Sequence, residues 1–243
     1  MIRMNYTRFA VKLARWLPPA ILDMAVKKSR LNLAGDRDIE WSWVASQIPQ
    51  VPGEALDFGA GVGFLGLIAA QRGFSVTAID LGPAQWFYTH PGLRFVCGDI
   101  LKTSLPPKHF DLVINCSTVE HVGLAGRYGV TEDNRDGDLA AMGRLRDLMK
   151  PGGTMLLTVP VGQDAVFAPL HRVYGTHRLP MLLEGFLLEK EVFWVKDSQN
   201  RWVMAAKDTA LETKASAGSW NPSRNVYGLG CFVLRRGCPE PQC

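Results

Sequence analysis

The chain has 243 residues, of which 47% are hydrophobic and 21% are charged, and its formal net charge is +4. This composition excludes a disordered chain, and the length suits one domain with additions. No stretch approaches the ~18 consecutive apolar residues of a membrane-spanning helix. Five cysteines without a C-x-x-C pair argue against a disulfide framework and a compact zinc site, and they favour thiols in a reducing cytoplasm.

Most of the positive charge lies in the first thirty residues, which hold seven basic residues and one acidic residue. The rest of the chain is close to neutral, which argues against a nucleic-acid partner. Residues 6–17 have helical spacing with an apolar and a basic side, and Pro18-Pro19 ends the helix. We expect a helix that packs over the domain or caps the substrate pocket; the alternative is weak contact with an anionic membrane surface.

Short apolar runs alternate with helical patterns after Gly53. Strands of four to six residues that alternate with helices predict β-α-β units and a parallel sheet with helices on both faces. The predicted elements are a strand at 55–58, a helix at 63–72, strands at 74–79, 93–97 and 110–115, a short helix at 83–88, a helix at 138–150 and a strand at 154–159.

The last third of the chain has a different pattern. Strand-like runs at 189–196 and 202–206 flank a polar turn, and a further run covers 227–235. Consecutive strands without a helix between them predict an antiparallel edge on the parallel sheet. We expect one domain over 1–243, made of an N-terminal helical extension (1–50), a cofactor-binding core (51–162) and a substrate-side segment with the terminal strands (163–243).

A glycine-rich segment, residues 56–66, follows the first predicted strand and opens a helix. Glycines allow a tight turn and a close approach of ligand to backbone, and the helix N-terminus favours an anionic group. Asp80 ends the next strand, where a carboxylate can accept both hydroxyls of a ribose. These features predict a nucleoside cofactor, with a structural turn as the alternative, and Gly61–Gly66 also fits the dinucleotide pattern G-x-G-x-x-G.

Later segments favour a cofactor that carries positive charge. Asp57 lies inside the glycine motif, where a carboxylate repels a pyrophosphate and attracts an amino group. Gly98-Asp99-Ile100 closes the third strand with a carboxylate placed to accept an adenine amino group. Residues 110–121 run through the fourth strand into a loop that ends in Glu120-His121. Residues 148–154 contain the Pro-Gly-Gly sequence that ends the following helix.

In their order and spacing, these segments resemble the class I S-adenosylmethionine-dependent methyltransferases over residues 54–162. They resemble most the small-molecule branch with an S-x-x-E-H loop after strand four. The resemblance implies a Rossmann-like α/β fold, with a seven-stranded, mostly parallel sheet ordered 3-2-1-4-5-7-6 and strand 7 antiparallel. Residues 115–118, Asn-Cys-Ser-Thr, stand where exocyclic-amine methyltransferases have Asn/Asp-Pro-Pro-Tyr. This argues against an adenine, cytosine or glutamine-amide nitrogen as the acceptor.

The resemblance also implies roles for individual residues. Residues 57–63 would hold the methionine moiety, Asp80 the ribose, and Asp99 with Ile100 the adenine, against whose ring Leu81 would pack. The full set of predicted cofactor-binding residues is Asp57, Phe58, Gly59, Ala60, Gly61, Gly63, Asp80, Leu81, Asp99, Ile100, Asn115, Cys116 and Ser117.

Two neighbouring residues are the catalytic candidates. His121 is the leading candidate for a base that removes the proton of an alcohol or phenol. The alternatives are that it orients the loop, hydrogen-bonds the cofactor or is a packed imidazole. Glu120 would orient His121 or bind the cofactor side, or it is a solvated carboxylate or a charge at a helix start. For Cys116 we expect a small buried thiol rather than a nucleophile.

A second polar cluster follows the fifth strand, at the edge of the sheet where ligands bind in such folds. The sequence predicts substrate binding there, of a sugar, phosphate or carboxylate, and a fold-stabilising network is the alternative. No ligand spacing supports a metal. In the acidic run 131–138, Asp136 or Asp138 is expected to cap the following helix, and the run could also form a flap over the substrate. The predicted substrate-binding residues are His171, Arg172, Tyr174 and Arg178.

Together these observations predict a cytoplasmic enzyme that transfers a methyl group from S-adenosylmethionine to a small polar acceptor. An oxygen of a saccharide or other secondary metabolite is the expected acceptor, and neither nucleic acid nor metal takes part. The alternatives are an NAD-dependent oxidoreductase that uses Gly61–Gly66 and a non-catalytic methyltransferase-like binding protein. The sequence gives neither the acceptor itself nor the oligomeric state.

Overall fold

The computed structural model describes residues 37–84, 86, 88–216 and 226–237. All of them belong to one compact unit, Ala34–Cys243. The helix predicted for residues 6–17 lies outside the described residues, and the division of the whole chain into domains stays a prediction. Within the described part, no helix is long and apolar enough to cross a membrane.

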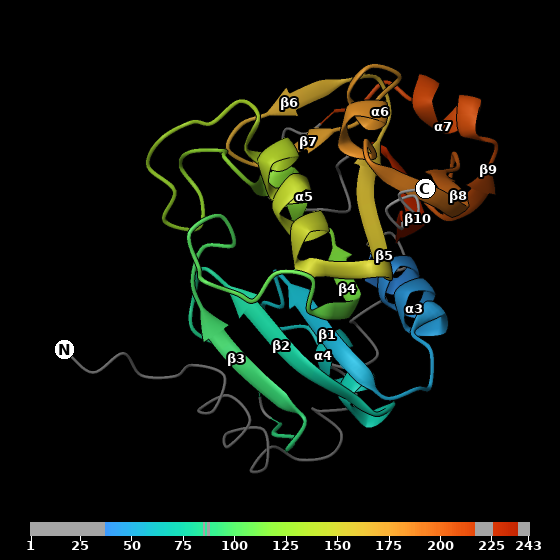
Figure 1. Cartoon of the computed structure of the whole chain (residues 1–243). Helices are drawn as coiled ribbons and strands as arrows, with labels where there is room; N and C mark the ends of the chain where they lie inside the picture. The colour runs from blue at the N-terminus through green and yellow to red at the C-terminus, as the bar shows by residue number, and fades with distance from the viewer. Residues whose placement is uncertain (1–36, 85, 87, 217–225, 238–243) are drawn as a thin grey trace, which may run out of the picture. The chain divides into compact units, whose positions relative to one another are not determined.

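The central element is an eight-stranded sheet with the order β3-β2-β1-β4-β5-β10-β8-β9 (Figure 1). Strands β1 to β5 are parallel, β10 is antiparallel to both β5 and β8, and β8 is antiparallel to β9. The strands are β1 Gly53–Phe58, β2 Phe74–Asp80, β3 Leu93–Cys97, β4 Phe110–Cys116, β5 Met149–Val161, β8 Phe186–Lys196, β9 Trp202–Ala205 and β10 Gly228–Arg236.

The predicted strand order is confirmed for seven strands, because β10 and β8 occupy the places of strands 7 and 6. The eighth strand, β9, forms because the polar turn after β8 closes a hairpin, in which Arg201 Nη2 lies 2.7 Å from Asp197 Oδ2. Two short strands, β6 (Ala165–Phe167) and β7 (His171–Val173), form a separate antiparallel pair. This pair follows β5 directly and lies beside the loop after β4.

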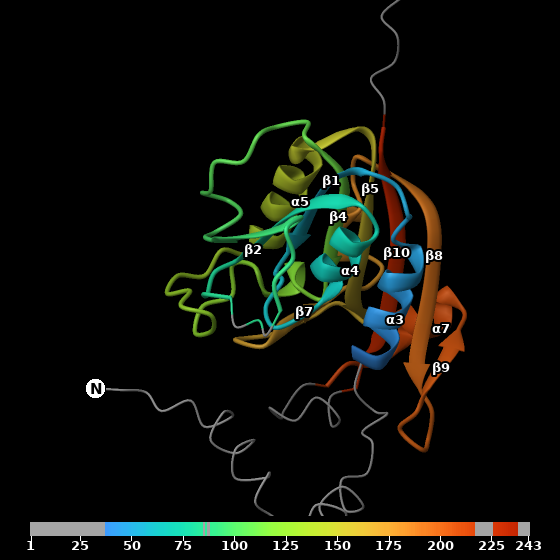
Figure 2. The same ribbon diagram turned by 90° about the horizontal axis from the view of Figure 1, so that it is seen from below.

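Helices cover both faces of the sheet, as Figure 2 shows for α3 and α4 on one side and α5 on the other. Two hydrophobic clusters correspond to the two faces: one packs α3 and α4 against β1 and β4, and the other packs α5, α6 and α7 against the opposite face. The helices are α3 Arg37–Gln47, α4 Leu65–Gln71, the 3-10 helix η1 Val119–His121, α5 Gly137–Leu148, α6 Arg178–Leu182 and α7 Lys207–Glu212.

Three local predictions are corrected by the structure. The described residues between 83 and 88 are not helical; instead Trp86 Nε1 donates to the Gly61 carbonyl (3.0 Å) and the Tyr88 hydroxyl donates to the Gly63 carbonyl. The fifth strand begins at Met149, so the Pro-Gly-Gly stretch lies within it. Asp136 stands at the N-cap of α5 without a side-chain cap, and Asp138 binds side chains of other elements.

Candidate cofactor and acceptor cavity

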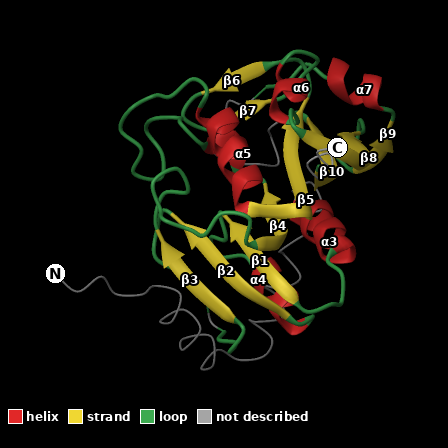
Figure 3. Ribbon diagram, viewed as in Figure 1, coloured by secondary structure: helices red, strands yellow, loops and turns green. Residues whose placement is uncertain are grey.

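A cavity of about 800 Å³ lies at the carboxyl ends of β1 to β4, which is the edge where α/β sheets bind ligands. Its volume is within the usual range for small-molecule sites. Much of its wall is loop, including the long connection between β4 and α5 (Figure 3). The lining residues are Arg37, Trp41, 57–63, Leu65, Asp80, Leu81, 98–102, 116–118, 121–123 and 128–134.

Asp57 lies at the end of β1, at the floor of the cavity. Its carboxylate is buried, and Oδ2 accepts the backbone N–H of Gly66 at 2.9 Å, in the first turn of α4. Burial, with a further contribution from the charge of Asp80, raises the pKa of Asp57 to about 7. A carboxyl group in this state gains from a positively charged ligand, because such a ligand favours its ionised form.

The other two carboxylates are also fixed by turn backbone. Asp80 Oδ2 accepts the N–H of Gly61 at 2.9 Å, and its Oδ1 accepts the N–H of Gly82 at 3.1 Å. Asp99 Oδ1 accepts the N–H of Leu101 at 2.9 Å. The three carboxylates thus stand at the ends of three adjacent strands, around one cavity.

The glycine loop needs glycine for conformational and steric reasons. Gly59 has φ +72° and Gly61 has φ +48°, values that side chains rarely adopt. A Cβ on Gly59 would overlap the side chain of Thr118. The loop therefore packs directly on the segment that follows β4, and the two segments form one continuous wall of the cavity.

All the predicted cofactor-binding residues line the cavity except Asn115. The Asn115 side chain is fully buried under the loop, where Oδ1 accepts the N–H of Val119 (3.3 Å) and Nδ2 contacts Met142 Sδ (3.5 Å). It supports the turn into η1 from below. Successive side chains of a strand point to opposite faces of the sheet. Asn115 therefore lies under the loop, whereas Cys116, the next residue, reaches the cavity.

Cys116 lies at the cavity wall as a buried thiol. Burial, with the negative charge of Glu40, raises the pKa of the Cys116 thiol well above its usual value. The Thr158 hydroxyl lies 3.4 Å from its Sγ. The group is therefore protonated at neutral pH, which agrees with a packing role and not with a nucleophile.

His121 lines the cavity and has a defined tautomer. Its Nδ1 lies 2.6 Å from the Leu170 carbonyl oxygen, which can only accept, so Nδ1 carries the hydrogen. Burial and the nearby Arg127 guanidinium lower the pKa of His121 to about 3. The ring is thus neutral near pH 7, and the lone pair on Nε2 can accept a hydrogen bond from a ligand.

Glu120 lies behind His121 and does not line the cavity. Its side chain is 2% exposed, and its Oε1 lies 3.7 Å from His121 Nε2. A carboxylate at this distance favours a positive charge on the imidazole ring. Glu120 can therefore act on a bound ligand through His121 but not by direct contact.

Sequence reasoning missed the contribution of α3. Arg37 and Trp41 of this helix line the cavity, and the fully buried Glu40 lies beneath them. Glu40 Oε1 accepts hydrogen bonds from the hydroxyls of Ser117 and Thr158, and its Oε2 lies 3.1 Å from Arg37 Nη1. No sequence signal marks these contacts, because the partners are 77 and 118 residues apart.

The loop before α5 forms part of the cavity wall. It includes much of the acidic run 131–138, for which the sequence also allowed a flap over the substrate. Residues 128–134 line the cavity, and Tyr128 has φ +55°, an uncommon value for an aromatic residue. The Tyr128 ring packs edge-on against His121 (5.6 Å between centroids), and the Arg127 guanidinium lies 4.5 Å from the Tyr128 ring centroid. Backbone strain of this kind is concentrated at ligand sites.

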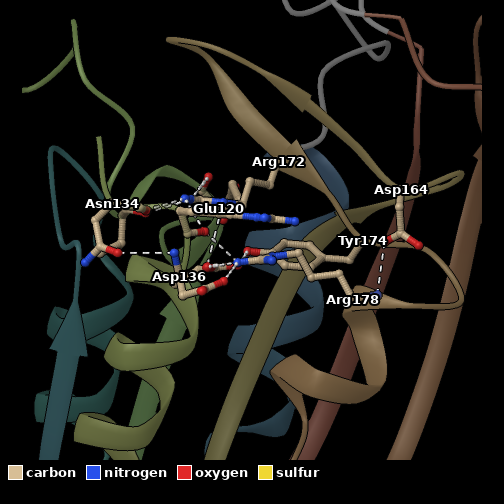
Figure 4. A network of polar contacts seen from close by, with 10 residues as sticks. Glu120, Asn134, Asp136, Asp164, Arg172, Tyr174 and Arg178 are labelled. Atoms are coloured by element: carbon tan, nitrogen blue, oxygen red, sulfur yellow. Dashed lines mark hydrogen bonds and ion pairs between the residues drawn. The ribbon is translucent and has the colours of Figure 1, made fainter. Parts of the chain in front are cut away.

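The predicted substrate-binding cluster lies elsewhere, since none of its four residues lines this cavity. Arg172 and Tyr174 are buried and bind protein groups, and the Tyr174 hydroxyl donates to Asp138 Oδ2 at 3.0 Å. Arg178 donates to both oxygens of Asp138, and His171 packs edge-on against Tyr227. These contacts form a network within the protein (Figure 4), and the assignment of the cluster to substrate binding stays a prediction. No group of metal-binding side chains occurs among the described residues.

Comparison with known proteins gives a partial family match. Residues 103–217 match a family model described as a Caenorhabditis protein of unknown function, DUF268. This stretch includes β4, the acidic loop and the elements from α5 to α7. No curated protein matches the chain.

Solved structures match the fold at low sequence identity. A Burkholderia thailandensis 1,6-didemethyltoxoflavin-N1-methyltransferase, with bound 1,6-didemethyltoxoflavin and S-adenosylhomocysteine, is 15% identical with a TM-score of 0.53, over 98% of this chain and 92% of that one. The N-methyltransferase NodS from Bradyrhizobium japonicum, in complex with S-adenosylhomocysteine, is 14% identical with a TM-score of 0.52, over 83% and 87%.

A third structure, an S-adenosylmethionine-dependent methyltransferase from Mesorhizobium loti, is 18% identical with a TM-score of 0.53, over 81% of this chain and 97% of that one. At such identities the similarity concerns the fold. The strand order, the antiparallel β10 and the helices on both faces agree with it. The chain has the Rossmann-like fold of the S-adenosylmethionine-dependent methyltransferases.

Proposed function

We propose that the protein transfers a methyl group from S-adenosylmethionine to an oxygen of a small polar acceptor. The observation that carries this proposal is that two backbone amides of the glycine loop and the following helix already donate hydrogen bonds to carboxylates of the protein. The N–H of Gly61 and the N–H of Gly66 donate to the carboxylates of Asp80 and Asp57. A dinucleotide would need such amides for its pyrophosphate and would meet two carboxylates instead. The NAD-dependent alternative is therefore disfavoured.

The described cavity suits the cofactor in volume and in the charge of its lining. S-adenosylmethionine supplies an electrophilic methyl group on a positively charged sulfur when it is bound. Asp57 would face the methionine part, Asp80 the ribose and Asp99 the adenine, and Ile100 and Leu81 offer apolar surface to the adenine ring. The absence of a Cβ at Gly61 leaves room for ligand beside the backbone.

His121 would hold the acceptor and take its proton. The lone pair on Nε2 accepts the hydrogen bond of an O–H group and so aligns the oxygen with the methyl group. With a pKa of about 3, the ring is a weak base in the resting site. A hydroxyl group that receives the methyl group becomes strongly acidic, and His121 Nε2 would take its proton; the bound cofactor would supply the methyl group and keep the S–CH₃ electron pair. Glu120, whose Oε1 lies 3.7 Å from Nε2, would be the carboxylate that faces the resulting imidazolium.

The proposal has two further parts, the cellular location and the class of acceptor, and each has its own support. The cytoplasmic location is supported by the described cysteines, Cys97, Cys116 and Cys231, which are all free thiols. The saccharide acceptor was inferred from the polar cluster around Arg172, and that cluster does not line the cavity. We therefore propose the acceptor as a small molecule with a hydroxyl group, without a narrower class.

The experiment is a screen of metabolite extracts with methyl-labelled S-adenosylmethionine, followed by mass spectrometry of the labelled product. His109 serves as the control, because it lies outside the cavity beside Glu54. We expect labelled product with the wild type and with His109→Ala, and a loss of about 10²–10⁴-fold with His121→Ala. Binding of S-adenosylhomocysteine without transfer to any acceptor would favour the non-catalytic alternative. Equal turnover in His121→Ala would remove the role of His121.

A further inference from the structure

Arg172, on strand β7, holds two cavity-lining segments through one side chain that is 2% exposed. Its Nη1 donates to the carbonyl oxygens of Glu120 (3.3 Å) and Val122 (2.6 Å). Its Nη2 donates to the carbonyls of Asn134 (3.0 Å) and Arg135 (3.3 Å). Figure 4 shows Arg172 beside Glu120 and Asn134. The loop after β4 and the loop before α5 are thus tied to a single guanidinium group.

The same short stretch also fixes the His121 ring. Glu120 and Val122 are the residues immediately before and after His121, so Arg172 holds its backbone from both sides. The carbonyl of Leu170, two residues before Arg172, accepts from His121 Nδ1 at 2.6 Å. Residues 170–172 therefore determine both where the His121 backbone lies and which ring nitrogen carries the hydrogen.

The buried guanidinium is paired with a buried carboxylate. Arg172 Nε lies 3.7 Å from Asp138 Oδ1, and Asp138 is fully buried. Asp138 also receives hydrogen bonds from Tyr174 and Arg178, which fixes its orientation. An arginine is needed at this position because its planar fork donates in several fixed directions, whereas a lysine ammonium is a single point.

We infer that Arg172 is a positioning residue that sets the tautomer and placement of His121 and thereby the acceptor side of the cavity. The catalytic consequence rests on the proposed methyl transfer. The effect on His121 does not, because it can be observed in the protein alone. Arg172 would act on turnover and leave cofactor binding unchanged, since the cofactor side is held by Asp57, Asp80 and Asp99.

The test compares Arg172→Lys with Arg144→Lys. Arg144 also donates from one guanidinium nitrogen to two carbonyls, those of Thr103 and Leu105, but it does not line the cavity. The readout is the ¹⁵N spectrum of the histidine rings at pH 7.5, with His121 assigned by comparison with His121→Gln. We expect one Nδ1–H tautomer in the wild type and in Arg144→Lys, and a mixture of tautomers in Arg172→Lys.

Kinetics and cofactor binding complete the test. We expect kcat to fall by about 10–100-fold in Arg172→Lys, because a displacement of about 1 Å can cost that much. The KM for S-adenosylmethionine and the Kd for S-adenosylhomocysteine should stay within about twofold of the wild type. Should Arg172→Lys fail to fold, Asp138→Asn is expected to give the same tautomer mixture, because it removes the counter-charge of Arg172 and one of the two acceptor oxygens that Tyr174 and Arg178 also use.

Two results would overturn the inference: an unchanged His121 spectrum in a folded Arg172→Lys or Asp138→Asn protein, or a kcat equal to that of Arg144→Lys. Failure of the proposed function has a different signature. In that case the wild type would transfer no methyl group to any acceptor, with or without binding of S-adenosylhomocysteine, whereas the His121 tautomer would still respond to Arg172.

Discussion

The cofactor side and the acceptor side of the cavity are held together in different ways. On the cofactor side, the carboxylates are fixed by amides that lie at most 19 residues away: Asp57 by Gly66, nine residues away, and Asp80 by Gly82 and Gly61, two and 19 residues away. On the acceptor side, the contacts join distant segments, such as Arg172 with Glu120 and Arg172 with Asn134, 52 and 38 residues apart. The cofactor side is thus built from local turns, and the acceptor side forms only when the whole fold has assembled.

The largest expected effect concerns the turn at Gly59. Gly59→Ala would place a Cβ against Thr118 in a left-handed conformation, and we expect a loss of roughly 3 kcal/mol or more in the free energy of unfolding. Cofactor affinity should fall with it. The matched control is Gly143→Ala in α5, where a Cβ meets nothing within 4 Å and a gain of about 0.5–1 kcal/mol is expected. Urea unfolding measures both, and equal effects would contradict the account.

The ionisation of Asp57 should lower the free energy of unfolding at high pH. Because its pKa rises from 3.8 to about 7 on folding, the folded state binds the proton more tightly, and stability falls as pH rises through this window. Asp57→Asn should therefore stabilise the protein above pH 7, by at most about 4 kcal/mol, and have little effect near pH 4. Cofactor binding should weaken at the same time. Urea titrations at pH 4.5 and 8.5 measure the difference.

Asp111 provides the contrasting carboxylate. Burial acts to raise the pKa of Asp111. Hydrogen bonds from the Glu54 amide and the Lys150 ammonium nevertheless hold this pKa below its usual value. Its contribution to stability is present above pH 4 and is lost as pH falls further. Asp111→Asn should accordingly destabilise the protein at pH 8.5, the opposite sign to Asp57→Asn. If both variants moved stability in the same direction at that pH, the assignment of Asp57 as a strained carboxyl would be wrong.

At the cavity floor, the buried contacts of Glu40 with Ser117 and Thr158 should be coupled. Glu40→Ala leaves the hydroxyls of Ser117 and Thr158 without their acceptor, at a cost of about 2 kcal/mol. Glu40→Gln, which keeps an oxygen, should cost less. A double-mutant cycle with Thr158→Val should give a coupling energy of about 1 kcal/mol. Additive effects would show that α3 is not tied to the cavity floor through this pair.

The same division explains what could be predicted from the sequence. Strand and helix periodicities and the glycine turn depend on neighbouring residues, and so the strands and the turn from Asp57 to Gly63 could be predicted. The sheet order and the roles of these residues were implied only by the resemblance to the methyltransferases. The cluster around Arg172 could not be assigned, because the same polar residue types suit a ligand site or an internal network. Its counter-charge, Asp138, lies 34 residues earlier in the sequence, where it was expected to cap α5.

A smaller effect should accompany cofactor binding. With a pKa of about 7, Asp57 is about half protonated at pH 7. A cationic ligand favours the ionised form, so binding should release up to about half a proton per site at this pH and almost none at pH 9. Calorimetry in buffers with different ionisation enthalpies measures the number of protons released. Asp57→Asn is the control and should release none; equal release by the variant would assign the proton to another group.

The central claim is that the three carboxylates of Asp57, Asp80 and Asp99 bind one positively charged nucleoside. The most direct measurement is calorimetric titration of the wild type with S-adenosylmethionine, S-adenosylhomocysteine and NAD. The account predicts one site for each of the first two ligands, with affinities reduced in Asp80→Ala and Asp99→Ala, and no measurable binding of NAD. Binding of NAD in preference to both S-adenosyl compounds would contradict it.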